Sequence, residues 1–373
     1  MQQLWIGLVV SVCLVFPAQA GVWHVYIGTY TRGESRGIYY CRLVTNPVRL
    51  TDPTLAANTE DPSFLAVHPT APVLVCVNEV PGPGYVSSFR VLSGRLSPVA
   101  KRPANGVAPC HLAFSPDGSL VAIANYGSGS LALFRATQDG ELNGPIQVVQ
   151  HQGSGADPRR QERPHAHAVL FTPDGRHLFA ADLGADSIFV YAVDSERGSL
   201  RLVASAKTAP GAGPRHLTLH PNGQYLYVIN ELNSTVDVLR WDPTKATLRR
   251  LQTVSTLPPG TTVQNTTAEI VVHPTGRWLY GSNRGHDSIV TYRVLDEGAR
   301  IEPLGWQPTG GRTPRNFALS PDGRFLLAAN QATDNVVLFR IDEQTGLPRP
   351  SGRSIRVPAP VCVLFVPPSA VGR

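Results

Sequence analysis

The stretch LTLHPNGQYLYVINE at residues 217–231 contains the unit from which the rest of the chain is built. An apolar run leads into a Pro-Asn-Gly turn, and a second apolar run ends at Asn230. Proline followed by Asn and Gly favours a tight turn, so the stretch predicts a β-hairpin. The same phrase recurs along the chain, with Asn, or once Asp, nine residues after the turn proline: FLAVHPTAPVLVCVNE (64–79), HLAFSPDGSLVAIANY (111–126), AVLFTPDGRHLFAADL (168–183), IVVHPTGRWLYGSNR (270–284) and FALSPDGRFLLAANQ (317–331).

The spacing of these hairpins predicts a β-propeller. Successive turn prolines lie 46 to 57 residues apart, and each interval also holds a third strand, such as SIVTYRV at 288–294, and a looser fourth. A repeat of about 50 residues made only of short strands and turns is typical of propeller blades. We therefore expect an all-β fold with seven four-stranded blades.

The seventh blade is expected to be shared between the two ends of the chain. WHVYIGT (23–29) and GIYYCRL (37–43) read as second and third strands without a first, and CVLFVP (362–367) supplies the missing one. Pairing these segments closes the ring and removes the open sheet edge. The sequence thus predicts one propeller domain over residues 21–373.

Residues 1–20 have the layout of a secretory signal peptide. An apolar run from Leu4 to Phe16 precedes Ala18-Gln19-Ala20, which is a typical cleavage pattern. We expect cleavage after Ala20 and a periplasmic or extracellular protein, with an uncleaved N-terminal anchor as the alternative. No other segment reaches membrane-spanning length.

Composition excludes several other classes of protein. Hydrophobic residues make up 42% of the chain and charged residues 16%, which excludes disorder. The net charge of +6 is spread without a basic run, so no nucleic-acid partner is expected. No zinc or calcium motif appears, and we predict no metal, no cofactor and a monomer. Four cysteines remain after cleavage, and the favoured interpretation is buried free thiols, with one disulfide as the alternative: Cys41, Cys76, Cys110 and Cys362.

Strand order predicts which polar residues meet. The first strand of each blade borders the channel, and the second runs back beside it. Residues six or five before the turn proline, and the residue after the Asn, therefore converge at one mouth. The charged and imidazole side chains expected there, with His165 close by, are His167, Arg215, Glu231, Glu269, Arg284 and Arg315. Such a set suits binding and proton transfer. Alternatively, the arginines and glutamates only hold the blades together, and 157–163 is only a solvated loop.

At these positions the chain resembles the bacterial lactonase family of seven-bladed propellers. The matching phrases are YIGTYT (26–31), GSGADPRRQERPHAH (153–167), GPRHLTLHPNGQYLYVINELNST (213–235), AEIVVHPTGRWLYGSNRGHDSI (268–289) and TPRNFALSPDG (313–323). That family includes 6-phosphogluconolactonases and is similar to fungal carboxy-cis,cis-muconate cyclases. The resemblance implies a pocket with catalytic His167, Arg215, Glu231 and Arg284, with Glu269 and Arg315 adjoining. We expect these two residues, together with the nearby His165, to bind the substrate.

The expected function is hydrolysis of a sugar-acid lactone, either 6-phosphogluconolactone or an unphosphorylated relative. Glu231 or His167 would take the proton of the attacking water, and the arginines would hold the oxyanion and an anionic substituent. The enzymatic alternative is a cycloisomerase of the muconate-cyclase type. The non-enzymatic alternative is a ligand-binding propeller, which predicts exposed aromatic residues at the mouth. The expected export disfavours a phosphorylated substrate, since the sugar-phosphate enzymes act in the cytoplasm.

Overall fold

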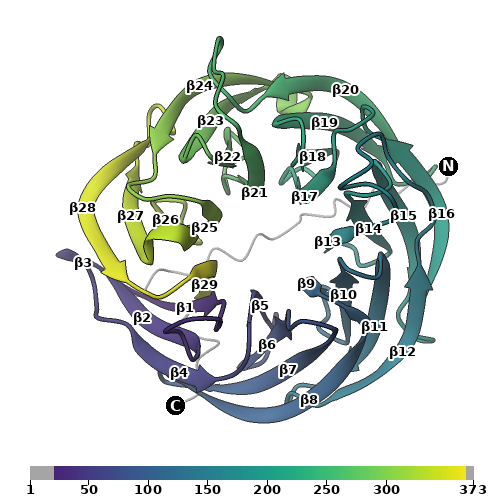
Figure 1. The fold of residues 1–373 in the computed structure, drawn as a ribbon, viewed down its shortest axis with the longest axis horizontal. Helices are drawn as coiled ribbons and strands as arrows, with labels where there is room; N and C mark the ends of the chain where they lie inside the picture. Colours follow the sequence, from purple (N-terminus) through teal and green to yellow (C-terminus); the bar gives the residue numbers. More distant parts are fainter. Residues whose placement is uncertain (1–20, 367–373) are drawn as a thin grey trace, which may run out of the picture.

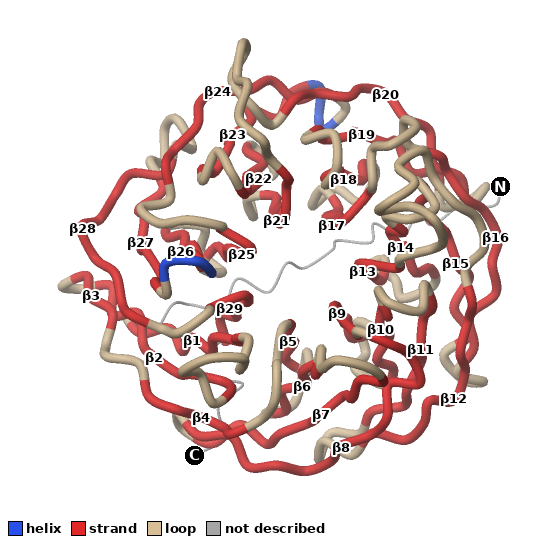
Figure 2. The backbone as a smooth tube through the Cα atoms, in the orientation of Figure 1, coloured by secondary structure: helices blue, strands red, loops and turns tan. Residues whose placement is uncertain are grey.

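The computed structural model describes residues 21–366, and the predicted signal peptide and Pro367 lie outside this range. Seven sheets are arranged around a central channel, which confirms the all-β propeller (Figure 1). Strands account for nearly the whole ring, and the helical turns are two short 3-10 segments (Figure 2): Asp296–Gly298 and Gln331–Thr333. No helix among these residues is long and apolar enough to cross a membrane.

Six blades are continuous in sequence, and each has four antiparallel strands running from the channel outward. Their strands are β5 (Phe64–Val67), β6 (Val73–Asn78), β7 (Pro83–Leu92), β8 (Arg95–Val107); β9 (Pro109–Phe114), β10 (Leu120–Asn125), β11 (Ser130–Ala136), β12 (Leu142–Gln150); β13 (Ala166–Phe171), β14 (His177–Asp182), β15 (Ser187–Asp194), β16 (Ser199–Lys207); β17 (Pro214–Leu219), β18 (Tyr225–Asn230), β19 (Thr235–Asp242), β20 (Thr247–Ser255); β21 (Thr266–Val272), β22 (Trp278–Arg284), β23 (Ser288–Leu295), β24 (Arg300–Pro308); β25 (Pro314–Leu319), β26 (Phe325–Asn330), β27 (Asn335–Ile341) and β28 (Pro348–Arg356).

The seventh blade joins the two ends of the described chain, as the sequence predicted. Its innermost strand is β29 (Pro360–Val366), which pairs antiparallel with β1 (Val22–Thr29), and β1 pairs with β2 (Gly37–Thr45). The outer strand is broken in two, β3 (Val48–Leu50) and β4 (Thr54–Asn58), and both pieces pair with β2. This sheet therefore has five strands where the prediction had four.

The hydrophobic core is divided into seven clusters, one between each pair of neighbouring blades. Second strands such as β10 are buried along their whole length, because neighbouring blades cover both faces. Outer strands such as β12 alternate between half-buried and exposed residues over most of their length, because one face meets solvent. The four cysteines are buried free thiols, as favoured from sequence.

The Asn at the end of most second strands has a structural role. The side chain of Asn283 is fully buried, and its Nδ2 donates to the Thr256 carbonyl oxygen at 2.9 Å. Thr256 lies in the segment that arrives from the preceding blade. Asp182 has the same place in its blade, where its Oδ2 meets His151 Nδ1 at 2.6 Å. Both side chains fasten the incoming linker to the next blade, whereas Asn230 bonds to Thr235 and Asp237 of its own blade.

Candidate active site

Irregular strand pairing aims the candidate side chains into the channel. In β17, Pro214 pairs with Asn230 and His216 with Ile229, so Arg215 has no partner in the ladder. A bulge of this kind turns a side chain out of the regular alternation. Counting Arg215, the pairing skips one residue in this way in five inner strands: Cys110, His167, Arg215, Arg315 and Val361. All five are the positions six before the turn proline that the sequence placed at the mouth.

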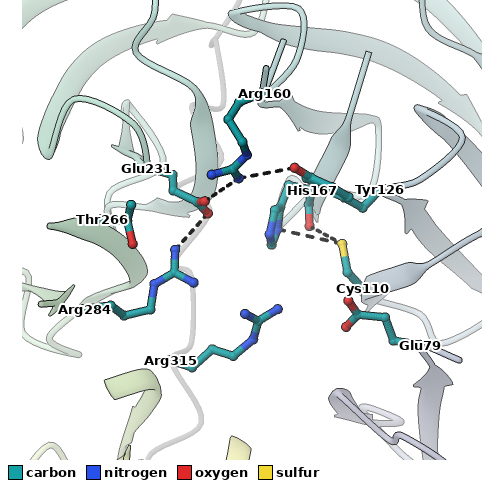
Figure 3. Close-up of a pocket in the computed structure, with 9 residues that line it drawn as sticks. All are labelled: Glu79, Cys110, Tyr126, Arg160, His167, Glu231, Thr266, Arg284 and Arg315. Carbon is teal, nitrogen blue, oxygen red and sulfur yellow. Dashed lines mark hydrogen bonds and ion pairs between the residues drawn. The ribbon is translucent and has the colours of Figure 1, made fainter. Parts of the chain in front are cut away.

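A cavity of about 340 Å³ opens at this mouth, within the size range of small-molecule sites. Its walls come from several blades and from the segment that precedes β13 (Figure 3). The residues lining it are Glu79, Cys110, Tyr126, Arg160, His167, Glu231, Thr266, Arg284 and Arg315. Polar and charged groups dominate, which suits a polar ligand.

Glu231 is the centre of an ionic cluster. Its Oε2 lies 3.0 Å from Arg215 Nε and 2.9 Å from Arg284 Nη2, and its Oε1 lies 2.7 Å from Arg160 Nη2. Burial alone would raise the pKa of this carboxyl, but the charges of Arg284, Arg215 and Arg160 outweigh burial and lower it to about 2. Glu231 is therefore ionised at any working pH, and its oxygens are already occupied.

Arg284 has one N–H group that forms no hydrogen bond within the cluster. Arg284 also donates from Nη2 to the Thr267 carbonyl oxygen at 2.7 Å, whereas its Nε is buried without a partner among residues 21–366. Burial lowers the pKa of Arg284 to about 10, so it stays charged at neutral pH.

Arg315 is the guanidinium available to a ligand. Within the described chain it makes no hydrogen bond or ion pair, and it lies over the Tyr30 ring at 5.3 Å from the centroid. Figure 3 shows its guanidinium directed into the cavity between Arg284 and Cys110. Such a group binds carboxylate, phosphate or a developing oxyanion well.

The site carries an excess of positive charge. Two carboxylates, Glu79 and Glu231, face four guanidinium groups, which leaves two positive charges in excess. The arginines are Arg160, Arg215, Arg284 and Arg315. A site with this balance favours a negative charge on the ligand or one that develops during a reaction.

His167 faces the cavity as a neutral imidazole. Burial, together with the charges of Arg215, His216 and Arg315, holds its pKa well below 6.5. Its Nδ1 lies 3.8 Å from the sulfur of Cys110. Since burial keeps the Cys110 thiol protonated by raising its pKa, this pair is not an activated cysteine nucleophile.

The structure brings together most of the residues that the sequence selected, and it separates two of them from the cavity. His167, Glu231, Arg284 and Arg315 line the cavity, and Arg215 lies directly beneath Glu231. The two others, His165 and Glu269, do not line it.

His165 and Glu269 have other neighbours. His165 stacks on the Tyr126 ring at 4.5 Å between centroids and contacts the Tyr126 carbonyl oxygen through Nδ1 at 2.9 Å, so it supports the cavity wall. Glu269 lies deeper in the channel, where it pairs with His216. In five other inner strands the pairing skips one residue, whereas in β21 it skips two, Ala268 and Glu269, which lie opposite Ser282. The Glu269 side chain therefore does not reach the cavity.

Arg160 was missed because the segment 157–163 had a plausible alternative as a solvated loop. The segment folds back over the channel, and buried Gln161 anchors it by donating to Asp186 Oδ1 at 2.6 Å and to the Leu183 carbonyl oxygen at 2.7 Å. The available signal was the interval of 57 residues between Pro116 and Pro173, the longest in the repeat. Three other residues that line the cavity lie at positions that the repeat places at the mouth, although none of them was predicted as a site residue: Glu79, Cys110 and Tyr126.

Comparison with known proteins agrees with this architecture. The sequence model of the family described as "Lactonase, 7-bladed beta-propeller" matches residues 24–365. The chain is 36% identical over 343 residues to a protein of Bacillus subtilis named 6-phosphogluconolactonase, with 91% of this chain and 97% of that protein covered.

Solved structures give the same result. A putative 6-phosphogluconolactonase from Bacteroides fragilis has a TM-score of 0.87 at 32% identity, covering 94% of this chain and 100% of its own. A periplasmic gluconolactonase from Pseudomonas aeruginosa has a TM-score of 0.87 at 34% identity, covering 93% of this chain and 99% of its own. The chain therefore belongs to the lactonase family of seven-bladed β-propellers.

Proposed function

We propose that this protein is a lactone hydrolase that opens a sugar-acid lactone by attack of water. The observation that carries the proposal is the unpaired Arg315 guanidinium beside Arg284 and the neutral His167 in one polar cavity. Ester hydrolysis needs donors for the tetrahedral oxyanion and a group that takes a proton. The guanidinium groups supply the first, and an imidazole of the channel supplies the second.

Glu231 has a supporting role in this scheme. A carboxylate whose pKa is about 2 holds a proton weakly, and its two oxygens already accept from three arginines. It therefore fixes Arg215 and Arg284 in place and neutralises part of their charge. Of the two residues that the sequence offered as proton acceptors, His167 fits better, because it is uncharged and faces the cavity.

The substrate class follows from the charge of the site and from the relatives. An excess of positive charge favours a lactone with an anionic substituent, or one whose charge develops at the carbonyl oxygen. Two relatives carry the names 6-phosphogluconolactonase and periplasmic gluconolactonase. The predicted signal peptide and the periplasmic relative support export, and we therefore favour an unphosphorylated sugar lactone outside the cytoplasm.

A lactone panel tests the proposal. The mature chain is incubated with gluconolactone, its 6-phosphate and a carboxylated sugar lactone, and proton release above the spontaneous rate is followed at constant pH. Hydrolysis releases one proton for each carboxylate formed, and we expect saturable release with at least one member. Opening by elimination also releases a proton, so the product is identified by mass: an unsaturated acid formed without addition of water would support the cycloisomerase, and saturable binding without turnover would support a binding propeller. Either outcome contradicts the proposal.

A further inference from the structure

A small recess continues the cavity toward the interior of the channel. It has a volume of about 10 Å³ and shares Glu79, Cys110 and Arg315 with the cavity above. The other residues lining it are Ser63, Phe64, Arg215, His216, Asn316 and Val361. A space of this size holds about one water molecule.

The recess offers polar partners for that water. Ser63 is 5% exposed, and its Oγ has no hydrogen-bond partner within residues 21–366. The guanidinium of Arg315 is likewise unpaired in this part of the chain. A buried hydroxyl without a protein partner is usually satisfied by an ordered water. His216 supplies the third polar side chain on this wall.

His216 forms a hydrogen-bonded dyad with a fixed carboxylate. Its Nδ1 lies 2.9 Å from Glu269 Oε1, which also accepts from the Ile270 amide at 3.0 Å. The side-chain Nδ2 of Asn316 donates to Glu269 Oε2, and the Oδ1 of the same side chain accepts from the Val363 amide at 2.8 Å. When Nδ1 donates to the carboxylate, the lone pair lies on Nε2. That nitrogen has no protein partner among the described residues.

We propose that the recess holds the nucleophilic water and that His216, oriented by Glu269, is the base that takes its proton. This inference rests on the proposed lactone hydrolysis. As the water attacks, one of its O–H bonds breaks, the proton passes to His216 Nε2, and the oxygen bonds to the carbonyl carbon. When the tetrahedral intermediate collapses, the ring C–O bond breaks and the ring oxygen takes the proton back from Nε2. The product is an open hydroxy acid, and no other reactant is needed.

The geometry favours His216 over His167 as this base. A base works best when a third group holds its tautomer and stabilises the imidazolium, and Glu269 does both for His216. The neighbour of His167 at Nδ1 is instead the Cys110 thiol, and no carboxylate contacts its ring. The two ring centroids are 5.2 Å apart, so His167 lies above the recess, where it can contact the substrate itself.

The dyad also predicts how the rate depends on pH. Burial raises the pKa of Glu269 to about 7, against the lowering effects of Ile270, Arg215, His111 and Asn316. The base form has an ionised Glu269 and a neutral His216, so kcat/KM is expected to rise as pH rises through about 7. The charged and titratable groups facing the dyad are His111 of β9, His167 of β13, Arg215 of β17, Glu231 after β18, Arg284 of β22, Arg315 of β25 and Cys362 of β29.

Substitution of individual imidazoles tests the inference. His216→Asn keeps an amide that can donate to Glu269 but removes Nε2, and we expect kcat to fall about 10²–10⁴-fold with little change in KM. The matched control is His111→Asn. The His111 ring lies 5.0 Å from that of His216 but lines neither the cavity nor the recess, so the kcat of this variant should stay close to wild type above about pH 8, where Glu269 is ionised in both proteins. His167→Asn should mainly raise KM.

Further variants keep the test decisive if His216→Asn fails to fold. Glu269→Gln should lower kcat and remove the rise through pH 7, and Ser63→Ala should lower kcat without changing that rise. In His216→Gly, added imidazole should restore turnover. Wild-type kcat in a folded His216→Asn, or an unchanged pH profile in Glu269→Gln, would overturn the inference while lactone hydrolysis by the wild type stood. Failure of the wild type to open any lactone would instead remove the proposed function.

Discussion

Replacing Glu231 with Gln separates a supporting role from a role as proton acceptor. The change keeps the shape of the side chain but removes the charge that Arg160, Arg215 and Arg284 share at 2.7–3.0 Å. The amide also brings N–H donors toward groups that are themselves donors. Arg215 and Arg284 have side-chain exposures of only 3% and 13%, so water replaces the lost partner poorly.

The size of the effect follows from the pKa of Glu231. A pKa lowered from 4.5 to about 2 corresponds to a stabilisation on the order of 3 kcal/mol from the ionised form. Loss of one partner of a buried ion pair typically costs a similar amount, about 3–5 kcal/mol. With an unfolding entropy of about 2.1 cal/mol/K per residue, a loss of ~3 kcal/mol lowers Tm by about 4 °C for a propeller of this length. Arg160 is 39% exposed, so water screens its ion pair with Glu231 more than it screens the other two.

Tm is measured by calorimetry and kcat/KM by turnover on the same preparation of each variant. We expect Glu231→Gln to lower Tm by about 4 °C and kcat/KM by about 10²-fold, because the oxyanion donors lose their orientation. The rise through pH 7 should remain. Glu79→Gln is the matched control, since Glu79 lines the same cavity, but its carboxylate accepts from Tyr30 at 2.9 Å and forms no ion pair with an arginine among residues 21–366. Its Tm should change little. Unchanged stability in Glu231→Gln, with loss of the pH dependence, would refute the reasoning.

The same carboxyl predicts behaviour in acid. Its pKa is lower in the folded than in the unfolded protein, so its contribution is present above about pH 4.5 and is lost as pH falls toward 2. Wild-type stability should therefore fall more steeply than that of Glu231→Gln over this range, as measured by urea unfolding at each pH. Parallel curves would contradict the assigned pKa.

Three further outcomes are expected. Arg315→Gln should raise KM for an anionic lactone about 10–100-fold and leave Tm nearly unchanged, because the guanidinium forms no hydrogen bond or ion pair within the described chain and only lies over the Tyr30 ring; equal KM values in steady-state kinetics would contradict its role. A chain that ends at Pro358 lacks β29 and should be insoluble or melt far lower, by several kcal/mol of lost core contacts, and an unchanged Tm would exclude the split blade. N-terminal sequencing of exported protein should begin at Gly21, whereas recovery of the uncleaved chain from the cytoplasm would disprove the signal peptide.

The propeller, the split blade and the residues at the channel mouth could all be predicted from the sequence alone. The spacing from each turn proline to its Asn fixes the length of a hairpin, so residues at its open end, such as Arg215 and Glu231, must meet. This inference needs only local geometry, because two strands joined by a tight turn pair in one register. Ring closure could be predicted in the same way, because the incomplete blade at one end of the chain can complete its sheet only with the unpaired strand from the other end.

Contacts between blades and within loops depended on the tertiary structure. Arg160 reaches Glu231 across 71 residues, through an insertion whose path is set by the buried anchor Gln161 and by no repeat. The bulges in the inner strands decide which side chains enter the channel, and the two-residue irregularity in β21 sends Glu269 to His216. The pKa values follow from burial and from charges contributed by several blades. They exist only once the ring has curved and closed, because desolvation and distance are properties of the assembled channel.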